Sequence, residues 1–473
     1  NYFRSSYVCA TVSADYYWSL WGLQEEDAEY IDALPGIHLR SANRILNGCL
    51  KNGGLYIKLG QGLVVLDHIL PKEYIQTLRT LQDKCLTRKK GEVFQLFIED
   101  FGRPLDEIFE YFDEEPIAAA SLAQVFKART KDGQEVAVKA QYIDLQDRFV
   151  GDVTTVKILL TVAGWLFPDF DFVWVLNELR GTLEKELNFL NEGKNSEHCA
   201  EDLAHMPYVY VPKVLWEVSS KRVLTTEFID GIKISNGDAL KDAGFSLADI
   251  DMKLFKAFSE QIFHTGFVHA DPHAGNILIR KGKDKKAQLV ILDHGLYEEV
   301  PKNVRESLRD LWKSIVLNDH ASMKKHSMEL GVQESDYRLF CIAIGQRYIR
   351  SQNKSDWDAD AIRTIMAPRG GKIVLKNLTD EERTRLQVEI IALRNRSLQV
   401  FKSIPGKLML VTSFPFRNIN TIRSIAHGHG DPVDRYKVMA RCATQGAFAA
   451  KKNSIAARIS GWKGRIHFEF RLW

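Results

Sequence analysis

The most chemically suggestive part of the sequence is a run of polar residues set between short apolar segments. Asp271 precedes Asn276 by five positions, and Asp293 begins an Asp-His-Gly sequence directly after the apolar run 289–292. A carboxylate can orient an attacking hydroxyl and accept its proton, while an amide and a second carboxylate offer the hard oxygen ligands that Mg²⁺ prefers. This order is typical of phosphoryl-transfer sites. We therefore predict Asp271 as the catalytic base, and Asn276 and Asp293 as metal ligands.

Two other interpretations of this run stay open at the level of sequence. His269, Asp271 and His273 occupy alternating positions and could ligate a transition metal. An Asp-Pro turn and an exposed Asp-His-Gly loop can also be purely structural. A lysine far upstream favours the phosphoryl-transfer interpretation over both.

That lysine belongs to a predicted hairpin. The apolar residues of 125–128 and 136–138 indicate two strands, joined by a Lys-Asp-Gly turn. Lys139 closes the second strand, where its ammonium could hold the α and β phosphates of a nucleotide. The loop before the first strand carries alanine where kinases have glycine, and the added Cβ atoms make it stiffer. We predict that this loop also binds nucleotide, through Ala118, Ala119, Ala120 and Ser121.

These motifs together resemble the UbiB or aarF-domain family of atypical protein-kinase-like proteins, and within it the mitochondrial aarF-domain-containing kinases. The family hallmark K-x-G-Q stands here as Lys58-Leu59-Gly60-Gln61, and the resemblance covers roughly 51–317. Lys58 and Gln61 are i, i+3 neighbours on one helix face, and Gly60 allows a close contact, so the two could point together into another surface. The resemblance implies that this extension lies across the nucleotide cleft.

The resemblance also implies acidic partners for the two lysines. It assigns Glu186 to the K-x-G-Q segment and Glu192 to Lys139. Six residues advance about 600° around a helix, so the two glutamates would face different directions. Asn188 stands where the family usually has Asp, which replaces an anionic ligand by a neutral amide. His294 stands in the place of the phenylalanine of Asp-Phe-Gly.

The function implied by the resemblance is Mg²⁺-dependent binding of ATP or ADP with phosphoryl transfer or ATP hydrolysis. A backbone hinge near Glu227 and Ile229 would take the adenine. The implied target is a small molecule or a lipid-linked process at the mitochondrial inner membrane, in lipid or quinone homeostasis and cristae maintenance, rather than a protein hydroxyl. Mitochondrial membrane proteins are implied partners. The alternative is a pseudokinase scaffold that binds nucleotide without turnover.

The expected fold class is α+β: a bilobal protein-kinase-like fold with an N-terminal helical extension. Apolar spacing predicts helices over 40–70, 71–86 and 144–203. The aromatic segment 1–35 is expected to be a helix packed on the body rather than a membrane-interface segment. We expect an N-terminal segment 1–50, the extension 51–112, an N-lobe with a helical insertion 113–230, a C-lobe 231–400 and a tail 401–473.

The composition is that of a globular chain. Of 473 residues, 45% are hydrophobic and 26% charged, with a formal net charge of +3, which argues against a dedicated nucleic-acid binder. Six scattered cysteines indicate free thiols.

The charge is concentrated at the C-terminal end. Residues 401–473 hold 13 Lys/Arg against 3 Asp/Glu. This basic tail could rest on anionic lipid, or its charges could be solvated on a helix that packs against the body; the sequence leaves both interpretations open. The alternation over 466–472 predicts a strand there, and His427-Gly428-His429-Gly430 is interpreted as a flexible turn.

Overall fold

The structure is a computed structural model that describes residues 1–24, 28–65, 70–82, 91–119, 122–166, 173–345, 349, 406–445 and 455–472. The chain forms two compact units. Unit 1 comprises 1–197 and 212–229, and unit 2 comprises 198–211 and 230–473. The chain therefore passes into unit 2 for the second time after Ile229, at the segment expected to be a hinge.

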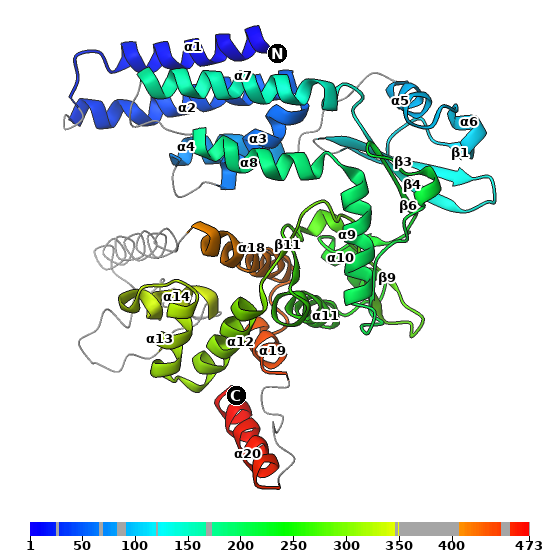
Figure 1. Ribbon diagram of the computed structural model, residues 1–473, viewed down its shortest axis with the longest axis vertical. Coiled ribbons are helices and arrows are strands. Elements are labelled where there is room, and N and C mark those ends of the chain that lie inside the picture. Colours follow the sequence, from blue (N-terminus) through cyan, green and yellow to red (C-terminus); the bar gives the residue numbers. More distant parts are fainter. Residues whose placement is uncertain are drawn as a thin grey trace. The chain divides into compact units, whose positions relative to one another are not determined.

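Unit 1 begins with a layer of helices. In Figure 1, α1, α2 and α7 run side by side, and α3, α4 and α8 lie beneath them. The predicted single helix over 40–70 is broken, because Gly53 and Gly54 adopt positive φ angles of 70° and 45°. The bounds are α1 Tyr2–Ser19, α2 Ala28–Asn52, α3 Gly54–Val65, α4 Lys72–Leu78, α7 Leu145–Leu166 and α8 Val173–Glu186.

An antiparallel sheet forms the rest of unit 1. Its strand order is β1-β3-β4-β6, with β2 paired to β3. Phe126, Val136 and Val138 are buried on the face covered by α5 and α6. The predicted hairpin is thus confirmed as β3 and β4. The bounds are α5 Glu92–Phe101, α6 Leu105–Ile108, β1 Phe109–Phe112, β2 Ala118–Ala119, β3 Ala123–Thr130, β4 Glu135–Gln141 and β6 Val223–Glu227.

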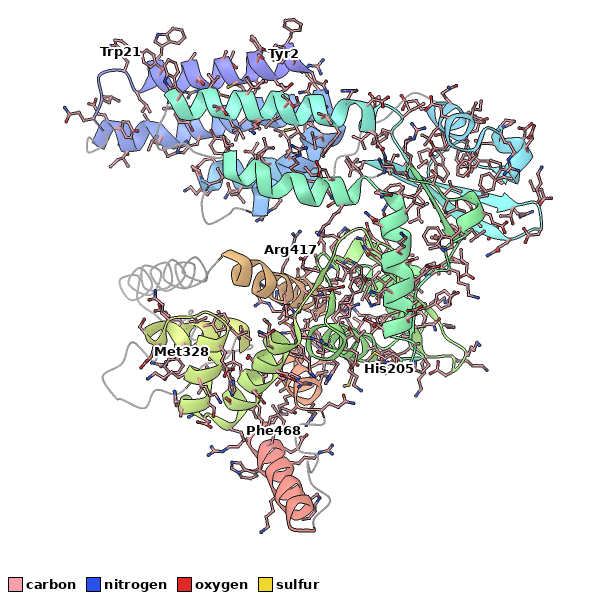
Figure 2. All side chains as sticks on the ribbon, viewed as in Figure 1. Tyr2, Trp21, His205, Met328, Arg417 and Phe468 are labelled. Atoms are coloured by element: carbon pink, nitrogen blue, oxygen red, sulfur yellow. The ribbon has the colours of Figure 1, made fainter. Side chains whose placement is uncertain are left out.

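The N-terminal aromatic residues lie on a packed helix but face outward. α1 packs against α2 and α7, as predicted. Phe3, Tyr7 and Trp18 are nevertheless 86%, 70% and 73% exposed. Figure 2 shows Tyr2 and Trp21 projecting from the outer side of this helix layer. Among the residues that the structure describes, no helix has the length and apolar content needed to span a bilayer.

Unit 2 is built on two small sheets. One has the order β5-β10-β9-β7, and the other pairs β11 with β8. A short π-helical turn, Gln261–Thr265, ends α11 and leads into β8. The bounds are β5 Val209–Tyr210, β7 Ile232–Lys233, α10 Gly237–Asp242, α11 Leu247–Glu260, β8 Phe267–His269, β9 Ile277–Lys281, β10 Ala287–Ile291 and β11 Tyr297–Glu299.

Helices from the C-terminal part of the chain complete unit 2. Trp312 of α12 is fully buried among residues of α14, α18 and α19. α18 also packs on α11, β8 and β11. The bounds are α12 Lys302–Leu317, α13 His320–Glu329, α14 Tyr337–Gly345, α18 Gly406–Gly428, α19 Arg435–Ala443 and α20 Ile455–Leu472.

The predicted C-terminal strand is wrong. Residues 455–472 form the helix α20, in which Phe468 (labelled in Figure 2) and Leu472 are buried while Ile466 and Phe470 are exposed. Buried residues four positions apart lie on one helical face. The apolar residues that alternate over 466–472 include Phe468 and Leu472, which are also spaced as neighbours on a helix. This segment is a helix because both side chains pack into the core of unit 2.

Candidate functional site

The polar residues predicted to carry chemistry lie at the ends of two antiparallel strand pairs in unit 2. β9 and β10 pair antiparallel, with Ile277 opposite Ile291. Asn276 therefore precedes one strand where Asp293 follows the other, and the Leu292 amide donates to the Asn276 carbonyl at 2.9 Å. This register brings the two predicted metal ligands to one end of the sheet.

The second strand pair places Asp271 beside the same loop. β8 pairs with β11, and the Ala270 amide donates to the Leu296 carbonyl at 3.0 Å. Asp271 therefore leaves β8 next to the segment that carries Asp293. Its carboxyl side chain is 42% exposed, so an entering hydroxyl could reach it. The structure thus brings the predicted base and the predicted ligands into one loop cluster.

The buried His269 imidazole links these two loops. Its Nδ1 accepts from the Asp271 amide at 3.0 Å, and its Nε2 donates to the Asp293 carbonyl at 2.9 Å. Burial holds the pKa of this imidazole below its ordinary value, outweighing the carboxylates of Asp293 and Asp271. The ring is therefore neutral and is protonated on Nε2. Both nitrogens are engaged with the backbone, which contradicts the interpretation of His269 as a transition-metal ligand.

His294 turns inward and leaves the neighbouring aspartate on the accessible side. Its ring is hydrogen bonded to the Tyr297 hydroxyl at 2.9 Å and to the Ile291 carbonyl at 3.1 Å. The Asp293 Oδ1 accepts from the Gly295 amide at 2.9 Å. The histidine thus occupies a buried position where an aromatic ring also fits.

The donor set suits Mg²⁺. Asn276 offers an amide oxygen and Asp293 a carboxylate, from adjoining strand ends. Among the described residues, no group of three or more His, Cys, Asp or Glu side chains could hold a metal. Two protein ligands are what a nucleotide-bound Mg²⁺ requires, because phosphates supply further oxygens.

The helix α18 reaches this loop cluster, which sequence reasoning missed. The Arg417 guanidinium, labelled in Figure 2, lies 3.3 Å from the Asp271 carboxylate. Asn418 is fully buried and donates to the His269 carbonyl at 2.8 Å. Arg417 and Asp271 are 146 positions apart, and no spacing rule relates them.

In unit 1, the strand lysine has the partner that the family resemblance implied. The Lys139 ammonium lies 2.6 Å and 2.9 Å from the two carboxylate oxygens of Glu192. Glu192 is 4% exposed and lies in the first turn of α9 (Phe189–Asp202), where the helix dipole favours an anion. The Phe189 ring lies 5.1 Å from the ammonium. These contacts hold the lysine in place on β4.

The alanine-rich loop is described in part. Ala118 pairs with Val125, and Ala119 with Gln124, at the start of β3. Lys139 pairs with Val125 on the other side, so these alanines lie two strands away from it. Ala120 and Ser121 lie outside the described residues, and the role of the loop in nucleotide binding stays a prediction.

The K-x-G-Q residues contact different elements. Lys58 forms an ion pair with Glu186 at 2.8 Å, as the resemblance implied. Gln61, however, donates to the Leu81 carbonyl at 2.9 Å, so the two side chains do not point together into one surface. A Cβ added to Gly60 would lie 2.3 Å from the Leu81 Cδ1 atom. The glycine therefore permits close packing of α3.

The single helix expected through Glu186 and Glu192 is broken between them. α8 ends at Glu186 and α9 begins at Phe189. The Asn188 Oδ1 accepts from the Leu190 amide at 3.2 Å, a local bond that competes with helix continuation. The break, rather than helical rotation, directs the two glutamates to different lysines.

The predicted adenine hinge lies at the end of unit 1. Glu227 ends β6, and its Oε2 accepts from the Lys213 amide at 3.1 Å. The next residue donates its amide to the Glu135 carbonyl at 3.1 Å. Ile229 is the last residue of unit 1. Adenine binding here stays a prediction.

Comparison with known proteins identifies the family. The model of the ABC1 atypical kinase-like domain matches residues 80–327, which begins after the K-x-G-Q segment. AarF domain-containing protein kinase 1 of Mus musculus is 33% identical over 99% of this chain and 86% of its own length. The Drosophila melanogaster AarF domain-containing kinase 1 is 31% identical over 98% of this chain and 87% of its own length.

A Dictyostelium discoideum protein named "probable serine/threonine-protein kinase" is 39% identical over 99% of this chain, which spans 65% of that relative's length. The family model and these relatives confirm the expected kinase-like α+β fold. The chain belongs to the ABC1, or aarF-domain, family of atypical kinase-like proteins.

Proposed function

We propose that this chain binds ATP or ADP with Mg²⁺ and transfers or hydrolyses the terminal phosphoryl group. The observation that carries the proposal is the His269 imidazole, which joins the backbone of Asp271 to that of Asp293. This bridge fixes the base and a metal ligand relative to one another. A loop with a merely structural role would not need both carboxylates on accessible side chains.

We assign a role in this reaction to each of the predicted residues. In unit 1, Lys139 holds the α and β phosphates and Glu192 orients it. In unit 2, Asp271 positions the attacking hydroxyl or water and accepts its proton. Asn276 and Asp293 would hold Mg²⁺, which when bound neutralises charge on the nucleotide phosphates. The names of relatives as kinases support this class of reaction.

We further propose that the acceptor is a small molecule or a lipid-linked compound at the mitochondrial inner membrane. The family resemblance and the basic tail support this. On α20, Trp462 and Phe470 are 67% and 77% exposed, and Lys463 and Arg465 are also exposed. Aromatic and cationic side chains on one helix suit a surface of anionic lipid, and mitochondrial membrane proteins are the further partners that we propose.

The test is ATP turnover by the wild type and by Asp293→Asn, each with and without vesicles of anionic lipid. We expect Mg²⁺-dependent turnover that falls at least about 100-fold in the variant, the scale of a lost electrostatic contact to the reacting group. Equal turnover rates of the wild type and Asp293→Asn, both with and without vesicles, would refute the proposal that this chain is an enzyme. Rescue of a null phenotype by Asp293→Asn would instead support the nucleotide-binding scaffold.

A further inference from the structure

The predicted catalytic loop carries no cation of its own. Residues 265–279 contain neither lysine nor arginine. His273, two positions after the base, uses its Nδ1 to accept from the Gly275 amide at 3.0 Å. Phosphoryl-transfer sites place positive charge at the transferring group, because negative charge is concentrated there in the transition state. The loop itself does not supply that charge through lysine or arginine.

The helix α18 brings an arginine to this position. The Arg417 Nη2 lies 3.3 Å from the Asp271 Oδ2, and the two side chains are 39% and 42% exposed. The helix is held firmly at this point, because Asn418 is fully buried and donates to the His269 carbonyl at 2.8 Å. The guanidinium is therefore partly accessible to solvent, whereas the helix that carries it is anchored at the next residue.

We propose that Arg417 is a catalytic residue that binds the transferring phosphoryl group, an arginine finger supplied within the chain. At rest it pairs with Asp271. When ATP binds, the guanidinium moves from the carboxylate to the oxygens of the γ-phosphate, whose geometry matches the planar fork of donors. This proposal rests on the proposed function and assigns a residue to it.

The resting pair is weak enough for this exchange. A charge-assisted hydrogen bond is usually about 2.7–2.9 Å long, and longer ion pairs between solvent-exposed side chains are weak. The 3.3 Å contact between half-exposed side chains belongs to that class. The exchange also frees Asp271, since an oxygen that accepts from Arg417 at rest becomes able to accept the proton of the attacking hydroxyl.

The chemical step transfers the γ-phosphoryl group of ATP to the oxygen of the acceptor. The bond from the acceptor oxygen to the γ-phosphorus forms as the bond from that phosphorus to the bridging oxygen breaks. ADP leaves with the electron pair of the broken bond. The proton of the acceptor hydroxyl, or of water in ATP hydrolysis, passes to Asp271. Arg417 donates hydrogen bonds throughout and exchanges no proton.

The experiment compares wild type, Arg417→Ala, Arg417→Lys and the control Arg423→Ala, an exposed arginine further along α18. Affinities for Mg-ATP and Mg-ADP are measured by calorimetry, and ATP turnover is measured in parallel. We expect Arg417→Ala to weaken ATP binding about 10-fold or more, with ADP affinity unchanged, and to lower turnover about 1,000-fold. Arg417→Lys should recover part of both, and Arg423→Ala should behave as wild type.

The outcomes separate this proposal from the proposed function. If the wild type turns over ATP and Arg417→Ala keeps both its rate and its ATP-to-ADP affinity ratio, the role of Arg417 is refuted while the enzyme stands. If the wild type shows no turnover but Arg417→Ala selectively loses ATP affinity, the arginine contact stands and the catalytic function fails. Absence of nucleotide binding by the wild type overturns both.

Discussion

Replacement of His429 should destabilise unit 2, because this histidine neutralises a buried carboxylate. His429 follows α18, and its Nδ1 donates to the Asp251 Oδ1 at 2.7 Å. Its Nε2 donates to the Ile234 carbonyl at 2.7 Å. When Asp251 is ionised both partners are acceptors, and an imidazole that donates from both ring nitrogens carries a positive charge. The His429 and Asp251 side chains are 1% and 0% exposed.

The expected loss follows from this burial. Removing one partner of a buried ion pair costs about 3–5 kcal/mol, because the other charge is left without compensation. His429→Leu should therefore lower the free energy of unfolding of unit 2 by about that amount, a large share of the 5–15 kcal/mol typical of folded proteins. His427→Ala is the matched control. Its side chain is 80% exposed, and exposed positions change stability by about 0.5 kcal/mol or less.

The same pair predicts a pH dependence. The hydrogen bond to Asp251 raises the pKa of His429 above its ordinary value, against burial and the nearby Lys241. A raised histidine pKa stabilises the fold fully below about pH 6.5, and the contribution is lost as pH rises through the folded-state pKa. Relative to the uncharged double variant Asp251→Asn with His429→Gln, the wild type should lose its advantage at alkaline pH.

Urea unfolding at a series of pH values measures these differences, and hydrogen exchange of α11 peptides locates them. The reasoning is refuted if His429→Leu costs no more than His427→Ala. It is equally refuted if the advantage of the wild type over the double variant grows from neutral to alkaline pH.

Three further substitutions test other parts of the molecule. Ala119→Gly should change the ratio of ATP to ADP affinity in calorimetry, and identical ratios would count against a role of this loop in nucleotide binding. Gly60→Ala should lower the unfolding midpoint, because the added Cβ would lie 2.3 Å from the Leu81 Cδ1 atom. Such overpacking costs about 1–3 kcal/mol, whereas the better helix propensity of alanine contributes about 1 kcal/mol. A raised midpoint would contradict this. Asn418→Ala should lower the free energy of unfolding by about 1–3 kcal/mol, because it leaves the buried His269 carbonyl without its donor. The control Asn420→Ala, at an exposed position of the same helix, should not lower it. Equal urea midpoints for the two variants would refute the structural role of the Asn418 hydrogen bond.

The sequence allowed prediction of features that depend on local spacing. The order of Asp271, Asn276 and Asp293 predicted loops at strand ends, because apolar runs flank each residue closely. The Lys-Asp-Gly turn predicted the β3–β4 hairpin. The pairings of Lys58 and Lys139 with their glutamates followed from the family resemblance, and both ion pairs are present.

The remaining features depend on packing between distant segments. The contact of Arg417 with Asp271 spans 146 positions, and no periodicity in either segment encodes it. His429 lies in a glycine-rich segment interpreted as a flexible turn, yet it is buried against Asp251. The tail adopts the helical period because Phe468 finds a buried position on unit 2. Each outcome was decided by a tertiary partner that local patterns do not contain.

The most direct test of the proposed function is the Mg²⁺ dependence of ATP binding by the wild type and by Asp293→Asn, measured by calorimetry. If Asp293 holds the metal, removing Mg²⁺ should weaken ATP binding by the wild type about 10-fold or more, equivalent to about 1.4 kcal/mol. The same removal should have little effect on Asp293→Asn. Equal ATP affinity of the wild type with and without Mg²⁺ would contradict the proposal.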